Sequence, residues 1–436
     1  MGSAGVVSRE ALPDGPRLPR VVQTVLFMRS RHKVVPRWLR RYGDPFTVRL
    51  AAGRTLVLLS KPEDIREVFA GPASVFHAGR GNAVLAPVMG EHSVLILDGD
   101  EHLRSRKRLM PAFNGAALRG YAGMMDELAV DAAEKWPTGT PFAVRGPMNA
   151  LTLEIILRVV FGMADGERLA KLRPLIAKVT DIGVVSVLGW SYPRLNRFWP
   201  WKRDLENLLA ADELLYAEIR DRRAHPDLAE RNDVLSRLLT ADPDASDVEL
   251  RDHMMTLLLA GHETTATALA WSFHELARHP EILRKAQEAA DTGDDDYLQA
   301  VAKEAMRLRP VIYGVARKLT EPTVIAGRLL PKGIVVTPSI GLVHQDADHH
   351  PAPGEFRPER FVGAQPEAGT WIPFGGGVRR CLGAGFSLQE AAAVLKAVLV
   401  RYDLEPVGPP EPEKTRNITL IPAHGARIIA RPRTLA

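Results

Sequence analysis

The only cysteine of this 436-residue chain, Cys381, lies in a loop rich in glycine and arginine, FGGGVRRCLGAG. Cysteine binds metals and attacks substrates as the thiolate. Arg379 and Arg380 place positive charge beside it, and an apolar helix expected to begin near residues 382–387 would direct free backbone N–H groups toward the sulfur. One thiolate is too few for a cysteine-rich zinc site but is enough for a haem iron. The loop therefore indicates a metal ligand or a nucleophile, with an inert buried cysteine as the alternative.

A second candidate site lies in the middle of a long predicted helix. The helix would begin at a capping box, Ser246 to Glu249, and stop at Pro280, so at about 1.5 Å per residue it would be roughly 50 Å long. Its middle is apolar on all sides, which is typical of a buried helix. Glu263 and Thr264 interrupt this stretch beside Gly261. An acid followed by a hydroxyl suits proton delivery to a bound oxygen species. The alternative is a helix kinked by glycine and by threonine back-bonding.

Glu304 and Arg307 form a third pattern, because residues three apart on a helix share one face and can pair. Alone this spacing carries little information, since surface helices contain many such pairs. His344, His349 and His350 follow further along the chain. Their spacing implies no metal-ligand geometry, and we therefore expect them in a solvated loop.

Taken together, these patterns resemble those of the cytochrome P450 family, the haem-thiolate monooxygenases. The cysteine motif of that family is matched here by Phe374, Gly377, Arg379, Cys381 and Gly383. Its Glu-x-x-Arg motif is matched by Glu304 and Arg307, and its helix motif by residues 260–265. The segment FRPERF supplies the arginine that follows a Pro-Glu pair in the family, Arg360.

The resemblance implies a role for each matched residue. Cys381 would be the iron ligand of haem b (heme, iron protoporphyrin IX), and Glu263 and Thr264 the catalytic proton relay. Further residues that would contact the cofactor are His102, Arg106, Arg317, Arg379, Gly261 and Phe374, of which the first four would reach the haem carboxylates. Glu304, Arg307 and Arg360 would form a structural ion network behind the cysteine loop.

The same resemblance covers residues 1–436 and implies a single domain. Its fold would be mainly α-helical with small β-sheets, and haem would be held between the long helix and the cysteine loop. The chain itself indicates β-rich parts near residues 46–60, 315–340 and 415–432. We expect a hairpin turning at Gly53, a helix capped by Ser60, and a C-terminal hairpin turning at His424-Gly425.

Net charge, apolar runs and cysteine content bear on where the protein acts and what it binds. A net charge of +5 is too small to argue for nucleic-acid binding. The apolar run VVQTVLFM, residues 21–28, is far too short to span a membrane and lacks the features of a signal peptide. With one cysteine and no such segment, the chain is expected to be cytoplasmic, and we expect a monomer.

The resemblance further implies the reaction and its partners. Dioxygen would be the co-substrate, and two electrons would come from NAD(P)H through a ferredoxin and a ferredoxin reductase. The basic face that we expect to contact the ferredoxin comprises Arg104, Lys107, Arg108 and Arg380. Apolar segments at residues 74–97, 172–192 and 311–315 predict a lipophilic substrate, such as a terpenoid, fatty acid, steroid or polyketide, that is hydroxylated or epoxidised. Three alternatives are a peroxide-driven enzyme, a haem-thiolate isomerase or lyase, and a haem sensor or carrier without turnover.

Overall fold

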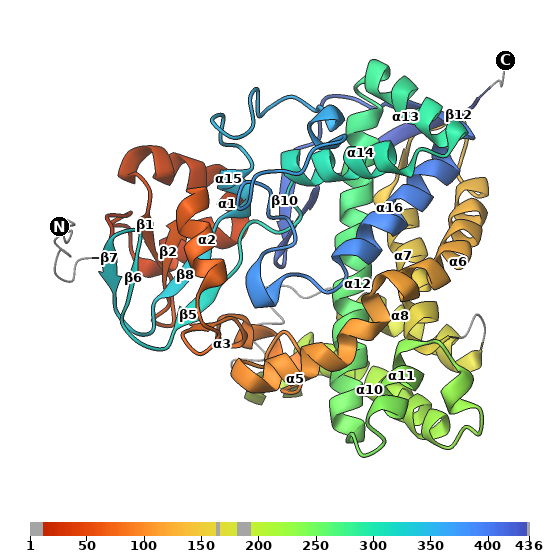
Figure 1. Ribbon diagram of the computed structural model, residues 1–436, viewed down its shortest axis with the longest axis horizontal. Helices are drawn as coiled ribbons and strands as arrows, with labels where there is room; N and C mark the ends of the chain where they lie inside the picture. Colours follow the sequence, from red (N-terminus) through yellow and green to blue (C-terminus); the bar gives the residue numbers. More distant parts are fainter. Residues whose placement is uncertain (1–11, 163–165, 181–192, 434–436) are drawn as a thin grey trace.

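The computed structural model describes residues 12–162, 166–180 and 193–433. Over these ranges the chain is mainly helical, with the largest sheet and the β6-β7 pair on one side of the molecule and β12 near α13 on the other (Figure 1). The helices are α1 (Arg20–Tyr42), α2 (Pro62–Ala70), α3 (Gly79–Asn82), α4 (Ala86–Met89), α5 (Gly99–Leu109), α6 (Gly115–Glu134), α7 (Arg145–Phe161), α8 (Glu167–Val179), α10 (Trp201–Arg223), α11 (Val234–Ala241), α12 (Asp247–Leu276), α13 (Pro280–Thr292), α14 (Asp295–Leu308), α15 (Ile340–Val343) and α16 (Ala384–Leu399). None of the helices in these ranges is long and apolar enough to cross a membrane.

The strands build four sheets within the described residues. The largest has the order β1-β2-β8-β5-β3, and the others are β4-β12-β9, β10-β11 and β6-β7. Their bounds are β1 (Phe46–Arg49), β2 (Thr55–Leu59), β3 (Phe76–His77), β4 (Phe142–Ala143), β5 (Arg317–Leu319), β6 (Thr323–Ile325), β7 (Arg328–Leu330), β8 (Val335–Pro338), β9 (Tyr402–Pro406), β10 (Glu413–Arg416), β11 (Thr419–Pro422) and β12 (Arg427–Pro432).

The N-terminal hairpin is confirmed, since β1 and β2 pair antiparallel and Gly53 between them has φ +74°. β2 also pairs parallel to β8, which brings residues 46–60 and 315–340 into one sheet. Both faces of β2 are buried: Leu56 and Leu58 face one apolar core, whereas Val57 and Leu59 face another. This explains why the strand is a continuous apolar run rather than an alternating one.

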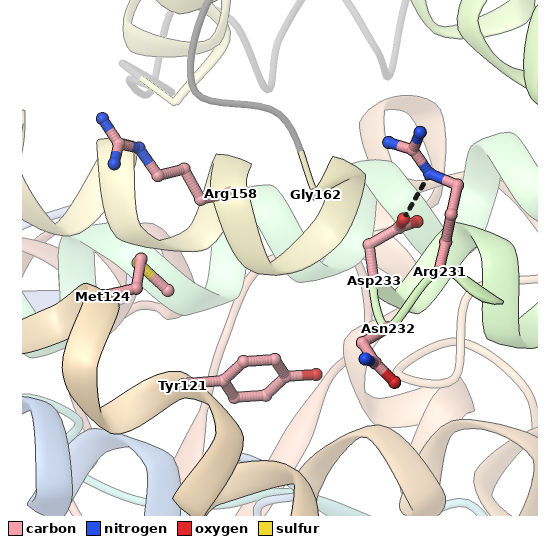
Figure 2. A pocket seen from close by; sticks show the side chains of 7 residues that line it. All are labelled: Tyr121, Met124, Arg158, Gly162, Arg231, Asn232 and Asp233. Carbon is pink, nitrogen blue, oxygen red and sulfur yellow. Dashed lines mark hydrogen bonds and ion pairs between the residues drawn. The ribbon is translucent and has the colours of Figure 1, made fainter.

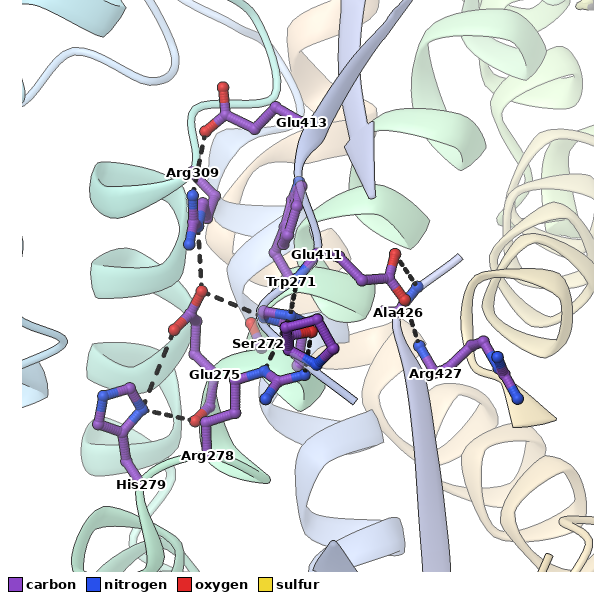
Figure 3. A network of polar contacts seen from close by, with 12 residues as sticks. Trp271, Ser272, Glu275, Arg278, His279, Arg309, Glu411, Glu413, Ala426 and Arg427 are labelled. Carbon is purple, nitrogen blue, oxygen red and sulfur yellow. Dashed lines mark hydrogen bonds and ion pairs between the residues drawn. The ribbon is translucent and has the colours of Figure 1, made fainter. Parts of the chain in front are cut away.

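The expected C-terminal hairpin is wrong. β11 pairs with β10 across a turn at Asn417, and β12 pairs instead with β9 and β4. The segment at His424-Gly425 is a connection between two sheets. Glu411 holds it, because its carboxylate accepts the backbone N–H groups of His424, Ala426 and Arg427 at 2.8–3.2 Å. Figure 3 shows the contacts with Ala426 and Arg427.

Of the two helix caps predicted from the sequence, Ser246 is confirmed and Ser60 is wrong. Ser246 does cap α12, because its hydroxyl accepts the N–H of Glu249 at 3.2 Å. Ser60 does not cap α2. Its hydroxyl donates to Asp44 at 3.0 Å instead, and the helix begins at Pro62, whose fixed φ suits a first helical position.

Helix α12 runs through the helical part of the molecule and packs most extensively against α7 (Figure 1). Its end is anchored by a buried carboxylate, Glu275, whose Oε1 accepts a hydrogen bond from Arg309 at 3.0 Å (Figure 3). Arg309 also lies 3.5 Å from Glu413 in β10. The network therefore joins α12, the end of α14 and the β10-β11 hairpin.

Candidate active site

The cysteine loop is shaped by glycines that pack against α2. Gly377 has φ +64°, and a Cβ there would lie 2.1 Å from the carbonyl oxygen of Phe69. A Cβ on Gly376 would collide with the Phe69 ring. Within the loop, the N–H of Cys381 donates to the carbonyl oxygen of Phe374 at 2.9 Å. These glycines therefore serve the close approach of two backbones, which only a residue without a side chain permits.

Cys381 is solvent-exposed, although protein crowds around its sulfur. Burial raises the pKa of its thiol, and this effect outweighs the N–H of Gly383 and the charges of Arg106 and Arg380, which lower it. The loop thus provides donors and cations for a thiolate, but the isolated thiol keeps its proton. A bound metal ion would displace that proton and stabilise the thiolate.

A group of basic side chains lies beside this loop. His102 and Arg106 lie one turn apart on α5, while Arg317 lies in β5 and Arg379 precedes Cys381. Burial, followed by the positive charges of the three arginines, lowers the pKa of His102 to about 3. Burial also lowers the pKa of Arg317 and of Arg379 to about 10. The four side chains predicted to reach the cofactor carboxylates are therefore brought together.

Arg379 already has a carboxylate partner within the protein. Its Nη2 lies 2.6 Å from Asp98, and its Nη1 donates to the carbonyl oxygen of Val94 at 3.1 Å. Asp98 also accepts the N–H groups of Gly79 and Arg80 at 2.8 and 2.9 Å. Asp98 thus ties the cysteine loop to α3 and to the start of α5.

Glu263 lies in the middle of α12, and arginines from two distant elements contact it. Arg145, at the start of α7, lies 3.3 Å from its Oε1, and Arg416 of β10 lies 3.1 Å from the same atom. These two arginine side chains are 16% and 26% exposed. The carboxylate is therefore paired at the edge of the core rather than sealed inside it.

Thr264 faces away from that core. α12 is buried along most of its length, but Ala260 is exposed and Gly261 and Thr264 are half-buried. The Thr264 hydroxyl donates to the carbonyl oxygen of Ala260 at 2.8 Å, which is the back-bonding considered as an alternative, yet the helix continues without a break. A Cβ on Gly261 would lie 2.9 Å from Ile156 of α7. The glycine therefore allows α7 to approach closely.

Glu304, Arg307 and Arg360 form a compact buried network. Arg307 makes a bidentate contact with Glu304 at 2.7 and 2.9 Å, and both side chains are fully buried. Arg360 lies 3.3 Å from the same carboxylate, and the N–H of Arg357 donates to it at 2.9 Å. The remaining N–H groups of Arg307 donate to the carbonyl oxygens of His344, Pro353 and Glu355. The pair is thus fully hydrogen-bonded.

Comparisons with known proteins decide the family. A family model described as Cytochrome P450 matches residues 13–429. The chain belongs to the cytochrome P450 family. It is 48% identical over 424 residues to a provisionally named cytochrome P450 135A1 of Mycobacterium tuberculosis, covering 96% of this chain and 94% of that protein.

Two further comparisons agree with this result. A provisionally named cytochrome P450 135B1 of Mycobacterium bovis is 46% identical over 436 residues, covering 97% of this chain and 92% of that protein. The solved structure of retinoic-acid-bound cyanobacterial CYP120A1 superposes with a TM-score of 0.85 at 24% identity, covering 97% of this chain and 100% of that one. The mainly helical P450 fold with small sheets is therefore confirmed, and the enzyme is a cytochrome P450 monooxygenase.

The residues of this P450 fit the haem that its family implies. Arg317 is buried and forms no ion pair with a carboxylate in the part of the chain that the structure describes. Nδ1 of the buried His102 has no hydrogen-bond partner there either. A buried cation that has only backbone carbonyl oxygens as acceptors, and a buried ring nitrogen without a hydrogen bond, are costly, and the two haem carboxylates would supply acceptors for both. Cys381 lies close enough to Arg106 for their charges to interact.

Sequence reasoning missed three side chains of this P450 that bind the predicted site residues. They are Asp98, which pairs with Arg379, and Arg145 and Arg416, which pair with Glu263. Asp98 had a local signal, since it directly precedes α5. The two arginines had none, because they lie more than a hundred positions from Glu263 in the sequence.

The expected solvated histidine loop is wrong for two of its three histidines. His344 is fully buried, and its Nε2 accepts the N–H of Ile372 at 2.9 Å. His350 is also buried and its Nε2 lies 2.9 Å from the carbonyl oxygen of Thr370. They position the segment before the cysteine loop. No cluster of metal-ligating side chains occurs within the described ranges.

A surface pocket of about 450 Å³ lies between α6, α7 and residues 231–233, and Figure 2 shows the side chains that line it. The side chains that line it include Tyr121, Arg158 and Asp233, and Arg231 lies 3.2 Å from Asp233. None of the site residues predicted from the sequence lines this pocket. It is therefore a feature separate from the candidate active site.

Proposed function

We propose that this P450 monooxygenase hydroxylates or epoxidises a lipophilic small molecule, using dioxygen and two electrons from a separate redox partner. The observation that carries the proposal is the exposed strip on an otherwise buried helix. Thr264 lies on this strip next to Glu263, a carboxylate with basic partners. An acid-alcohol pair of this kind suits proton delivery to oxygen and distinguishes a monooxygenase from a haem carrier.

Each remaining residue has a proposed task. Cys381 binds the iron, and Phe374 and the backbone of the cysteine loop support the sulfur. His102, Arg106 and Arg317 bind the haem carboxylates, with Arg379 held in place by Asp98. When bound, haem supplies the oxygen-activating chemistry. The residue range of the family model, 13–429, supports the proposal that residues 1–436 act as a single domain.

Proton movement is assigned to side chains of α12. Glu263 is paired with Arg145 and Arg416 at the edge of the core. Both arginine side chains are partly exposed, so water can reach this group of charges. We assign it to proton uptake. The Thr264 hydroxyl, which now donates to Ala260, can instead donate toward the exposed side of the helix by rotating about one bond. Acid and alcohol thus lie on the two sides of the same helical turn.

Apolar side chains support a lipophilic substrate. Of the segments expected to line the binding site, residues 74–97 and 311–315 are described, together with residues 172–180; residues 181–192 lie outside the described ranges. Leu95, Ile312 and Val315 are only half-buried. Val315 lies next to the cysteine loop, 3.7 Å from the Cβ position of Gly375. Half-exposed aliphatic groups near the loop favour an apolar ligand.

The electron donor is proposed to be an acidic ferredoxin, supplied through a ferredoxin reductase and NAD(P)H. Arg104 and Lys107 on α5 and Arg380 beside Cys381 are exposed, and so are the apolar side chains of Leu103 and Met110. Such a mixture of basic and apolar groups suits a transient docking surface. Arg108, which the sequence placed in this face, is bound to Asp242 at 2.8 Å and to Glu249 at 2.7 Å. We therefore exclude it from the contact.

Reconstitution tests the proposal. The full haem-loaded chain would be mixed with a ferredoxin, its reductase and NADPH, and screened against lipophilic compounds that shift the haem spectrum. Oxygen consumption that depends on the bound compound, with an oxygenated product, is the expected result. Turnover with peroxide but not with NADPH would indicate the peroxide-driven alternative. A rearranged or cleaved product that contains no added oxygen would indicate an isomerase or lyase, and spectral binding without turnover a sensor or carrier.

A further inference from the structure

An apolar ridge lies on the outside of the first half of α1. Its members are Leu18, Val21, Val22, Val25 and Met28. Their spacing of three and four places them along one side of a helix, and they are 37–66% exposed. Four of them, all except Leu18, belong to the run VVQTVLFM, to which the proposed function gives no task. Figure 1 shows α1 on the same side of the molecule as β1, β2 and β8, away from α6 and α13.

The opposite side of this half-helix faces the protein, where Leu26 and Phe27 pack against an apolar core and polar side chains make hydrogen bonds. Gln23 is 1% exposed, and its Nε2 donates to the carbonyl oxygens of Pro16 and Leu18 at 3.0 and 2.7 Å. Its Oε1 accepts the N–H of Arg49 at the end of β1 at 2.8 Å. The Thr24 hydroxyl accepts the N–H of Ala51, also at 2.8 Å. Hydrogen bonds and two apolar side chains therefore attach the segment to the protein, while a further row of aliphatic groups points outward, where an ordinary surface helix is polar.

The second half of the same helix has the usual orientation. The backbone departs from helical geometry at Ser30, with φ −144°. Beyond this point Val34, Val35 and Trp38 are buried in the apolar core on one face of the large sheet. The exposed apolar face is therefore confined to the part before Ser30 and does not follow from the fold as a whole.

The ridge lies in the most basic part of the chain. Residues 15–43 contain eight Lys and Arg and no Asp or Glu. Because the whole chain carries +5, the remaining residues together carry −3. Arg17 and Arg29 are exposed at the two ends of the ridge, and Lys33 is exposed just beyond it. A surface of this charge attracts anions over a distance of roughly 10 Å at 0.1 M salt.

We propose that this ridge docks the enzyme on the surface of an anionic lipid bilayer, with its aliphatic side chains between the headgroups and its arginines against lipid phosphates. Aliphatic groups flanked by arginine are the pattern of a helix that lies in a bilayer interface. A second copy of the chain fits less well, because a two-fold contact through this face would oppose Arg17 and Arg29 to their equivalents. The proposed ferredoxin face, on α5 and the cysteine loop, is a different surface and stays accessible.

Vesicle binding tests the proposal on the full haem-loaded chain. Vesicles of equal parts phosphatidylglycerol and phosphatidylcholine would be compared with pure phosphatidylcholine in a flotation assay at low and high salt. We expect binding to the anionic vesicles that weakens with salt. The variant V21S/V25S should reduce the apparent partition coefficient about tenfold, and R17Q/R29Q should reduce it about tenfold and flatten the salt dependence.

The matched control is V248S/V362S, which removes two aliphatic side chains that are 47% and 45% exposed elsewhere on the surface. It should bind like the unmodified enzyme, and all variants should keep their haem content and thermal midpoint. The proposal is overturned if the unmodified enzyme ignores anionic vesicles, or if V21S/V25S binds as well as the control. It is equally overturned if light scattering shows a dimer that V21S/V25S dissociates and vesicles do not bind.

Discussion

Two acidic residues, Glu304 on α14 and Glu263 on α12, are both buried, but their partners are of different kinds. Arg307 is only three residues from Glu304, and both side chains are fully buried. Every other donor to Glu304 comes from the short segment 357–360. Such a pair has no access to water, and removing either member would leave a buried charge without compensation.

Glu263 is bound instead by Arg145 and Arg416, whose side chains are partly exposed. Water can therefore reach both arginines, and the carboxylate can exchange one partner for another at a moderate cost in free energy. The two sides of the site therefore differ in how tightly their carboxylates are held. We propose that the Glu304 side is a rigid support for the cysteine loop, and that the Glu263 side is an arrangement of charges that can rearrange during a proton transfer.

The largest effect is expected when the predicted iron ligand, Cys381, is replaced. Cys381→Ala should abolish the thiolate-type band of the ferrous carbon-monoxide spectrum, because no other cysteine exists in the chain. Circular dichroism serves as the control for folding. A thiolate-type band that survives in this variant would falsify the assignment of Cys381.

The next test compares the two carboxylates directly. Glu304→Ala should lower the free energy of unfolding by about 3–5 kcal/mol and yield little haem-loaded protein, because it leaves Arg307 buried and unpaired. Glu263→Ala should cost clearly less, since its arginines can be hydrated. The measurements are chemical denaturation and haem content.

A surface pair provides the matched control for this comparison. Glu359 lies 2.7 Å from Lys285, and both side chains are almost half exposed. Glu359→Ala should cost at most about 1 kcal/mol. Equal losses in Glu304→Ala and Glu263→Ala would show that the two sides of the site do not differ in rigidity.

The Glu263 side of the site is tested through the neighbouring hydroxyl of Thr264. Thr264→Ala should keep haem and substrate binding but uncouple oxygen use from product formation, because the α12 strip then lacks its alcohol donor. Peroxide released per NADPH consumed is the quantity to measure. Thr264→Ser should restore much of the coupling, and full coupling in the alanine variant would mean that protons arrive by another route.

The smallest expected effect concerns electron entry on the cysteine side. Arg104→Glu with Lys107→Glu should slow reduction by ferredoxin several-fold at low salt and flatten its salt dependence, while reduction by dithionite stays unchanged. Arg108→Gln is the control, because this guanidinium is already bound to Asp242 and Glu249. If the double variant keeps the rate and salt slope of the unmodified enzyme, the docking surface lies elsewhere.

The sequence predicted those parts of the fold and site that depend on neighbouring residues. The cap of α12 at Ser246, the hairpin at Gly53 and the Glu304-Arg307 pair all join groups a few positions apart. Their geometry follows from local backbone conformation and helix periodicity. Ser60 shows the limit of such reasoning, because its hydroxyl donates to a nearby carboxylate, Asp44, instead of capping α2.

Sequence alone determined which chemical groups this protein carries, how the cysteine loop is composed and which helix bears the acid-alcohol pair. Only the tertiary structure decided that Glu263 is held by Arg145 and Arg416, that Arg379 pairs with Asp98, and that β11 pairs with β10. The reason is physical: short-range partners are set by bond geometry, whereas long-range partners are chosen by the packing of whole helices and sheets. The apolar ridge on α1 shows the same division, since the run of valines is visible in the sequence but its outward orientation results from the contacts of Gln23 and Thr24.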